Sequence, residues 1–182
     1  MLIFEKVSPE NTPVTVKLAL EIAKEMSMDV VLPSSTGASA FTVLELAAEL
    51  DYTGKIIVIT SVWRDGENSM SDENREKLTE SGAIIVTAGH ALSGAERSFS
   101  GKFNGVYPVE IIAHTLRLFC PGVKVCVEVG TMALDAGAIR KPRAVVAMGG
   151  TGMGLDTACV ITPGYSAKIF ETRIHEILCK PY

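Results

Sequence analysis

The chain has 182 residues, a formal net charge of −4 and 47% hydrophobic residues. This length suits a single domain over residues 1–182 with a sizeable buried core. The excess of acidic side chains argues against nucleic acid as a main partner. We recognise no signal peptide and no membrane-spanning run, so we expect a cytoplasmic protein without a membrane partner. The mean hydropathy of +0.28 is high, and we therefore expect some apolar surface to be buried in a homo-oligomer.

The first half of the chain alternates helical and strand patterns. The predicted elements, in chain order, are a helix opening at Thr12-Pro13, a strand over Met28–Leu32, a helix beginning near Ala40, a strand over Lys55–Thr60, a helix over Asp72–Ser81 and a strand over Ala83–Thr87. The first two helices have apolar residues on one face, the helix over Asp72–Ser81 is charged and polar, and the strands are short continuous apolar runs.

The second half begins with a segment, residues 88–107, that shows no regular period. The elements predicted after it are a helix over Pro108–Phe119, a strand over Val123–Val129, a short helix over Thr131–Ala138, strands over Arg143–Met148 and Ala158–Thr162, a helical turn over Ser166–Glu171 and a strand over Arg173–Cys179. Strands that alternate with helices predict an α/β fold with three layers: a mostly parallel sheet with helices on both faces.

One loop is rich in hydroxyl groups. Ser34, Ser35, Thr36 and Ser39 surround Gly37 between the first predicted strand and the next helix. Backbone N–H groups at a helix N-terminus, together with its partial positive charge, form a site for phosphate. The alternative is an ordinary strand-to-helix turn in which one hydroxyl caps the helix. Four hydroxyls exceed what capping needs, which favours phosphate binding.

The loops after five predicted strands share this composition. The segments are 34–39, 60–64, 87–90, 130–131 and 149–152, and each contains at least two Gly, Ser or Thr residues. Parallel strands end at one edge of a sheet, and ligands bind at that edge. The pattern predicts a cleft lined by amides and hydroxyls, suited to a small phosphorylated ligand of nucleotide size.

Other residues near this edge have two interpretations each. His90 is placed to contact a ligand or to make a structural hydrogen bond. Glu128 is an unusual residue for a buried strand; it either pairs with a cation or serves as a base, or it faces solvent at the strand end. Trp63 either stacks on a ligand or packs in the core. Four cysteines are present, but their spacing predicts no metal site.

The run from Thr12 to Thr60 resembles the C-terminal domain of pyruvate kinase. The likeness lies in its Ala-rich helix, its Ser-Ser-Thr-Gly loop and its Ile-Val-Ile-Thr strand. In those kinases the matching loop holds a phosphate of the allosteric sugar bisphosphate. Nearly the whole chain is similar to a small stand-alone family built on this domain, found mainly in archaea. The segments that carry this similarity are Val86–His90, Phe99–Tyr107, Val129–Gly137, Gly149–Gly152 and Asp156.

Members of that family are known with flavin mononucleotide (FMN) in the cleft, so the resemblance implies FMN as the cofactor. It supports a phosphate cradle formed by Ser34, Ser35, Thr36, Gly37 and Ser39. The residues expected to line the rest of the site are Thr60, Gly89, His90, Gly149, Gly150, Thr151 and Gly152. Residues 91–105 are expected to cover it.

The resemblance does not imply kinase activity. The barrel that carries the kinase site has no counterpart in the chain, and no carboxylate cluster is spaced to hold Mg²⁺. Two functions remain open at this stage. One is an FMN-binding protein with flavin-dependent redox chemistry. The other is a non-catalytic module that senses a phosphorylated metabolite.

Overall fold

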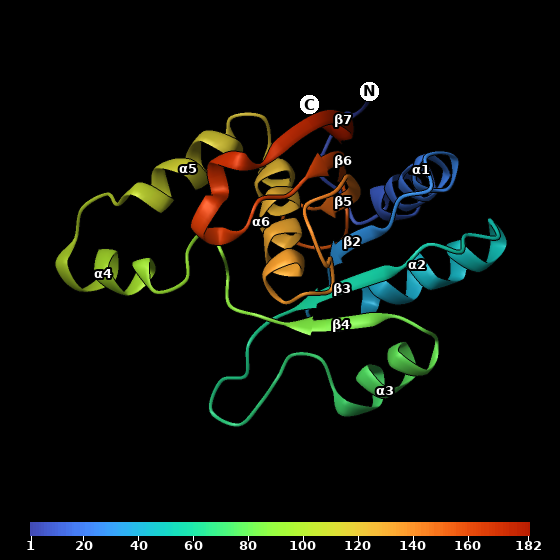
Figure 1. The fold of residues 1–182 in the computed structure, drawn as a ribbon, viewed down its shortest axis with the longest axis horizontal. Helices are drawn as coiled ribbons and strands as arrows, with labels where there is room; N and C mark the ends of the chain where they lie inside the picture. The colour runs from blue at the N-terminus through green and yellow to red at the C-terminus, as the bar shows by residue number, and fades with distance from the viewer.

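The computed structural model describes residues 1–182, and its centre is one seven-stranded sheet (Figure 1). The strands are β1 (Leu2–Phe4), β2 (Val30–Pro33), β3 (Ile56–Thr60), β4 (Ile84–Thr87), β5 (Val145–Gly149), β6 (Thr157–Thr162) and β7 (Arg173–Pro181). They lie in the order β1-β7-β6-β5-β2-β3-β4. Every neighbouring pair is parallel except the two pairs that β6 makes. The prediction of an α/β fold with a mostly parallel sheet is confirmed.

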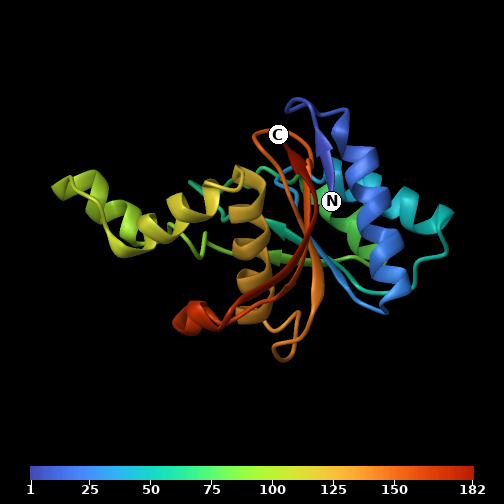
Figure 2. The same ribbon diagram turned by 90° about the horizontal axis from the view of Figure 1, so that it is seen from above.

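The helices are α1 (Asn11–Glu25), α2 (Ala38–Glu49), α3 (Asp72–Glu80), α4 (Glu96–Phe103), α5 (Pro108–Arg117) and α6 (Pro121–Asp135), with a 3-10 helix η1 over Ser166–Glu171. Figure 2 shows α1 and α2 on one side of the sheet and α6 on the other. None of these helices is both long and apolar enough to cross a membrane.

The central strands are buried on both faces, which explains their continuous apolar composition. Along β2, Val30 and Leu32 pack in the larger core beside α1 and α2, whereas Val31 packs in the core beside α6. The larger core has 21 buried residues and the other has 16. The alternation follows from the two-residue period of a strand. The sheet therefore holds the loops at its carboxyl edge on a rigid support.

Helix α6 replaces a predicted strand. The strand expected over Val123–Val129 is wrong, because α6 runs unbroken from Pro121 to Asp135 and includes the start of the predicted helix at Thr131. Twelve of its fifteen residues are buried. A helix that is buried all round lacks the one-sided apolar stripe that marks a surface helix, so its β-branched run looks like a strand. Pro121 at the first turn is the signal for its start.

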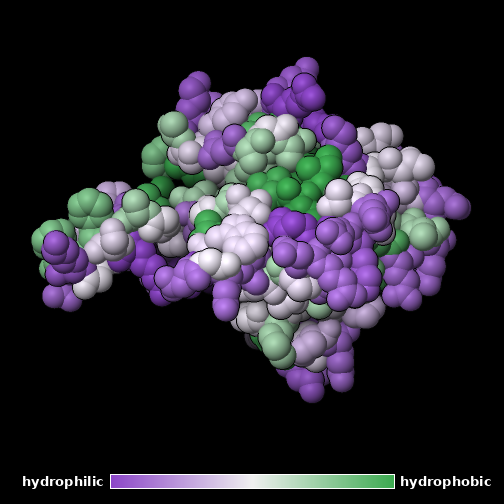
Figure 3. Space-filling model, turned by 90° about the horizontal axis from the view of Figure 1, so that it is seen from below, coloured by the Kyte–Doolittle hydropathy of each residue, from purple (hydrophilic) through white to green (hydrophobic).

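The irregular segment after β4 contains helix α4, which the sequence did not indicate. Helices α4 and α5 form an arm that projects from the body (Figures 1 and 2). No residue of α4 is buried, and Ala113 is the only buried residue of α5. Figure 3 shows hydrophobic side chains along this arm, and the exposed ones include Phe99, Phe103 and Val106. Helix α4 therefore projects from the body, whereas Ala91 and Leu92, at the start of the expected cover, pack against the body.

Candidate functional site

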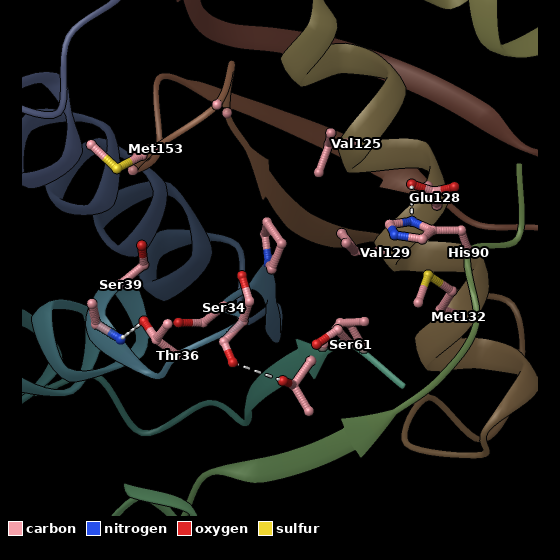
Figure 4. A pocket seen from close by; sticks show the side chains of 18 of the residues that line it. Ser34, Thr36, Ser39, Ser61, His90, Val125, Glu128, Val129, Met132 and Met153 are labelled. Carbon is pink, nitrogen blue, oxygen red and sulfur yellow. Dashed lines mark hydrogen bonds and ion pairs between the residues drawn. The ribbon is translucent and has the colours of Figure 1, made fainter. Parts of the chain in front are cut away.

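A cavity of about 530 Å³ lies at the carboxyl ends of β2 and β3 (Figure 4). Its volume falls within the range of small-molecule sites, roughly 300–1,000 Å³. One side is formed by the loop after β2 and the start of α2, and the other by α6 and His90. The turn after β5, with Gly150, Gly152, Met153 and Gly154, completes the lining. The cavity therefore lies where ligands bind in open parallel sheets.

The loop after β2 presents donors rather than acceptors. The carbonyl of Ser35 accepts a hydrogen bond from Thr60 Oγ1 at 3.2 Å, and that of Thr36 accepts one from Asn74 Nδ2 at 2.9 Å. In contrast, the backbone N–H groups of Ser35, Thr36 and Gly37 donate no hydrogen bond within the chain. The hydroxyls of Ser35 and Ser39 also have no partner there, and Ser34 Oγ accepts from the N–H of Ala40 at 3.4 Å. This end of the cavity is suited to an anion.

Gly37 determines the backbone conformation of this loop. Its φ is +98°, a conformation that side chains disfavour. A Cβ at this position would lie 3.3 Å from Leu78 Cδ1 and 3.5 Å from Asn74 Cβ, so it points toward α3. Gly37 does not line the cavity. It permits the turn that presents the N–H groups, and any substitution there strains the backbone.

The opposite wall is apolar and comes from one face of α6. Val125, Val129 and Met132 line the cavity there, with Glu128 among them. These four positions are spaced i, i+3, i+4 and i+7, so they form one helical stripe. Ile59 and Ala88 also contribute apolar surface to the lining. The cavity thus has a hydroxyl-rich end and an apolar end.

A charged cluster is built into the apolar wall. Glu128 is only 2% exposed. Its Oε2 pairs with Lys124 Nζ and lies 3.1 Å from His90 Nδ1, while its Oε1 accepts the N–H of Leu92 at 3.0 Å. Burial alone would raise the pKa of Glu128, but these hydrogen bonds from His90, Lys124 and Leu92 outweigh it and lower the pKa to about 2. Glu128 is therefore a carboxylate, and it ties the turn that carries His90 to α6.

Two hydrogen bonds fix the turn after β5, one within the turn and one to Thr12 of α1. Asp156 accepts the N–H of Thr151 at 3.0 Å, and Thr12 Oγ1 accepts the N–H of Leu155 at 2.9 Å. Gly149 does not line the cavity. A Cβ there would lie 2.3 Å from the carbonyl oxygen of Gly122, so Gly149 allows the start of α6 to approach β5. Residues 150 and 152–154 of this turn line the cavity.

The structure gathers eight of the twelve candidate residues around the cavity. They are Ser34, Ser35, Thr36, Ser39, Thr60, His90, Gly150 and Gly152. The other four, Gly37, Gly89, Gly149 and Thr151, are near neighbours that do not line it. The sequence reasoning missed the apolar stripe of α6, although its helical spacing was readable once that segment was taken as a helix.

Three further expectations need correction. Gly130 and Thr131 do not end a strand at the site: both are buried within α6, and a Cβ on Gly130 would lie 2.6 Å from Ile161 Cδ1. The favoured placement of Glu128 at a solvent-facing strand end is wrong, since it is buried in a helix. Trp63 neither packs in the core nor lines the cavity, because it is 51% exposed.

These features define an α/β protein with a single-sheet core and a two-ended cavity at the carboxyl edge of its strands. A scan against models of known protein families found no match. No three His, Cys, Asp or Glu side chains lie close enough together to hold a metal ion.

Proposed function

We propose that this cavity binds a phosphorylated ligand of nucleotide size, with its phosphate at the loop over residues 34–39. The observation that carries the proposal is the pair of unengaged N–H groups at Ser35 and Thr36, two cavity-lining residues beside the N-terminus of α2. Their carbonyls are bound elsewhere, so the loop offers donors to the cavity. Lysine and arginine are absent from the lining, and the phosphate is therefore held by neutral donors and the helix dipole.

FMN is the ligand that fits this description best. Its phosphate matches the hydroxyl-rich end, and its flat ring matches the wall of Val125, Val129 and Met132. The resemblance of the loop to the phosphate loop of pyruvate kinase C-terminal domains supports the same choice. Bound FMN supplies electron-transfer chemistry, whereas the protein supplies binding, orientation and electrostatics.

A substitution at Ser39 tests the phosphate position. Ser39 lies in the first turn of α2, where a carboxylate favours the helix. Ser39→Asp should therefore fold normally but repel a phosphate beside it. We expect FMN affinity, measured by calorimetry, to fall at least tenfold, which corresponds to about 1.4 kcal/mol. The loss combines a charge-assisted hydrogen bond and a like-charge repulsion.

Ser166→Asp is the matched control, because Ser166 is an exposed serine outside the cavity lining. It adds the same charge to the molecule and should leave FMN affinity unchanged within about twofold, as expected for distant screened charges. If the two variants bind FMN equally well, the phosphate does not lie at the start of α2, and the proposal fails.

A further inference from the structure

Phosphate binding leaves the charged cluster in the apolar wall unexplained. Lys124 and Glu128 have side chains that are only 8% and 3% exposed, yet the His90 side chain beside them is 58% exposed and lines the cavity. A buried ion pair is weak evidence for added stability, because removing two charges from water is costly. The pair holds one exposed imidazole at the apolar end of the cavity, and this placement suggests a chemical role.

The geometry determines the protonation pattern of His90. An ionised carboxylate only accepts hydrogen bonds, so the 3.1 Å contact between His90 Nδ1 and Glu128 Oε2 requires a proton on Nδ1. Nε2 of neutral His90 is therefore an unprotonated acceptor. It has no hydrogen-bond partner in the chain, and Figure 4 shows the ring with Nδ1 directed at Glu128 and its other nitrogen away from it.

Glu128 is itself fixed at both oxygens. Oε1 accepts the N–H of Leu92 at 3.0 Å, and Leu92 belongs to the same turn as His90. Lys124, one helical turn earlier on α6, forms an ion pair with Oε2. Among the residues that line the cavity, His90 and Glu128 are the only ones with Asp, Glu, His, Lys, Arg, Tyr or Cys side chains. Lys124 is the remaining charged group that faces the pair.

We propose that His90 is the general acid–base residue of this cavity and that Glu128 is its positioning residue. His90 Nε2 takes a proton from an N–H, O–H or carbonyl-activated C–H bond of the ligand. The N–H bond forms at Nε2, the electron pair stays on the ligand atom, and the imidazolium is stabilised by the Glu128 carboxylate. The same nitrogen then returns the proton to the product. The group that exchanges the proton lies on the ring of the phosphorylated ligand, which occupies the apolar end, so this inference rests on the proposed phosphate site.

The tautomer of His90 is measured by two-bond ¹H–¹⁵N correlation spectra of the labelled protein. We expect neutral His90 to carry its proton on Nδ1 alone. In the double variant Lys124→Met/Glu128→Gln, which removes both buried charges together, we expect both tautomers to be populated. A wild-type proton on Nε2, or a tautomer unchanged in the double variant, would overturn the proposal.

Contact with the ligand is measured by carbethoxylation with diethyl pyrocarbonate, which attacks unprotonated imidazole. The chain has three histidines, so His114 and His175 serve as internal controls. We expect saturating FMN to slow modification of His90 at least tenfold and to leave the two controls unchanged. If FMN binds but His90 is not protected, the acid–base role fails while the phosphate site stands. If FMN does not bind, the function proposed above fails, and the acid–base role that rests on it fails as well.

Discussion

At the scale of single residues, the pair of Lys124 and Glu128 makes a prediction about stability. Removing one partner leaves a buried charge uncompensated, which typically costs about 3–5 kcal/mol. We therefore expect Glu128→Gln to lower the free energy of unfolding by that amount in urea titrations. The double variant Lys124→Met/Glu128→Gln should recover most of the loss, because it leaves no lone charge. A single variant as stable as the wild type would show that the pair is not buried as described.

Glu128 also predicts how stability depends on pH. Its pKa is lowered in the folded protein from 4.5 to about 2. Between pH 2 and pH 4.5 the folded state therefore binds fewer protons at Glu128 than the unfolded state. The contribution of Glu128 to the free energy of unfolding is complete above about pH 4.5 and is lost as the pH falls toward 2. The full shift corresponds to about 3 kcal/mol. The double variant lacks this group, so its stability should fall less steeply over the same range.

At the scale of elements, the contact between α6 and β5 depends on a glycine. A Cβ on Gly149 would lie 2.3 Å from the backbone of Gly122, which cannot move without shifting the start of α6. We expect Gly149→Ala to lower the midpoint of thermal unfolding by several degrees, in keeping with a loss of about 1–3 kcal/mol for overpacking. The control is Gly101→Ala in α4, where a Cβ meets nothing within 4 Å. That change should be neutral or slightly stabilising.

The same helix shows where prediction from sequence succeeds and where it fails. Strands β2, β3, β4, β5 and β6 were predicted within two residues at each end, because short apolar runs bounded by turn residues are typical of buried strands. The prediction fails at Val123–Val129, the first part of α6, which has the pattern of a strand because a fully buried helix has no polar face to reveal its period. Lys124 and Glu128, spaced i and i+4, were the signal that it was helical.

The wrong strand in place of part of α6 also affected the prediction of the site. The hydroxyl-rich loop was found from composition, because donors at a helix start are local in sequence. The partnership of His90 with Glu128 joins residues 38 positions apart, and only the packing of α6 against the turn after β4 brings them together. Gly37 and Gly149 are candidates because they lie in loops that follow predicted strands. Gly149 allows two backbone segments to approach closely, and Gly37 adopts a positive φ. Both roles depend on neighbours that the sequence does not specify.

At the scale of the whole molecule, the body and the arm differ in how they are supported. The body has two hydrophobic cores, one on each side of the sheet. In the arm of α4 and α5, only one residue is buried. The exposed Phe99 and Phe103 of this arm are compatible with the expected homo-oligomer. That expectation stays a prediction, and sedimentation equilibrium of the purified protein measures it directly.

The central claim is that the cavity recognises a phosphate, and comparing FMN with riboflavin tests it most directly. The two compounds share the ring and differ by the phosphate alone. Calorimetric titration of the same protein sample with each should show FMN binding at least tenfold more tightly, since a charge-assisted hydrogen bond contributes about 1.5–3 kcal/mol. Equal affinity for the two compounds would contradict the account.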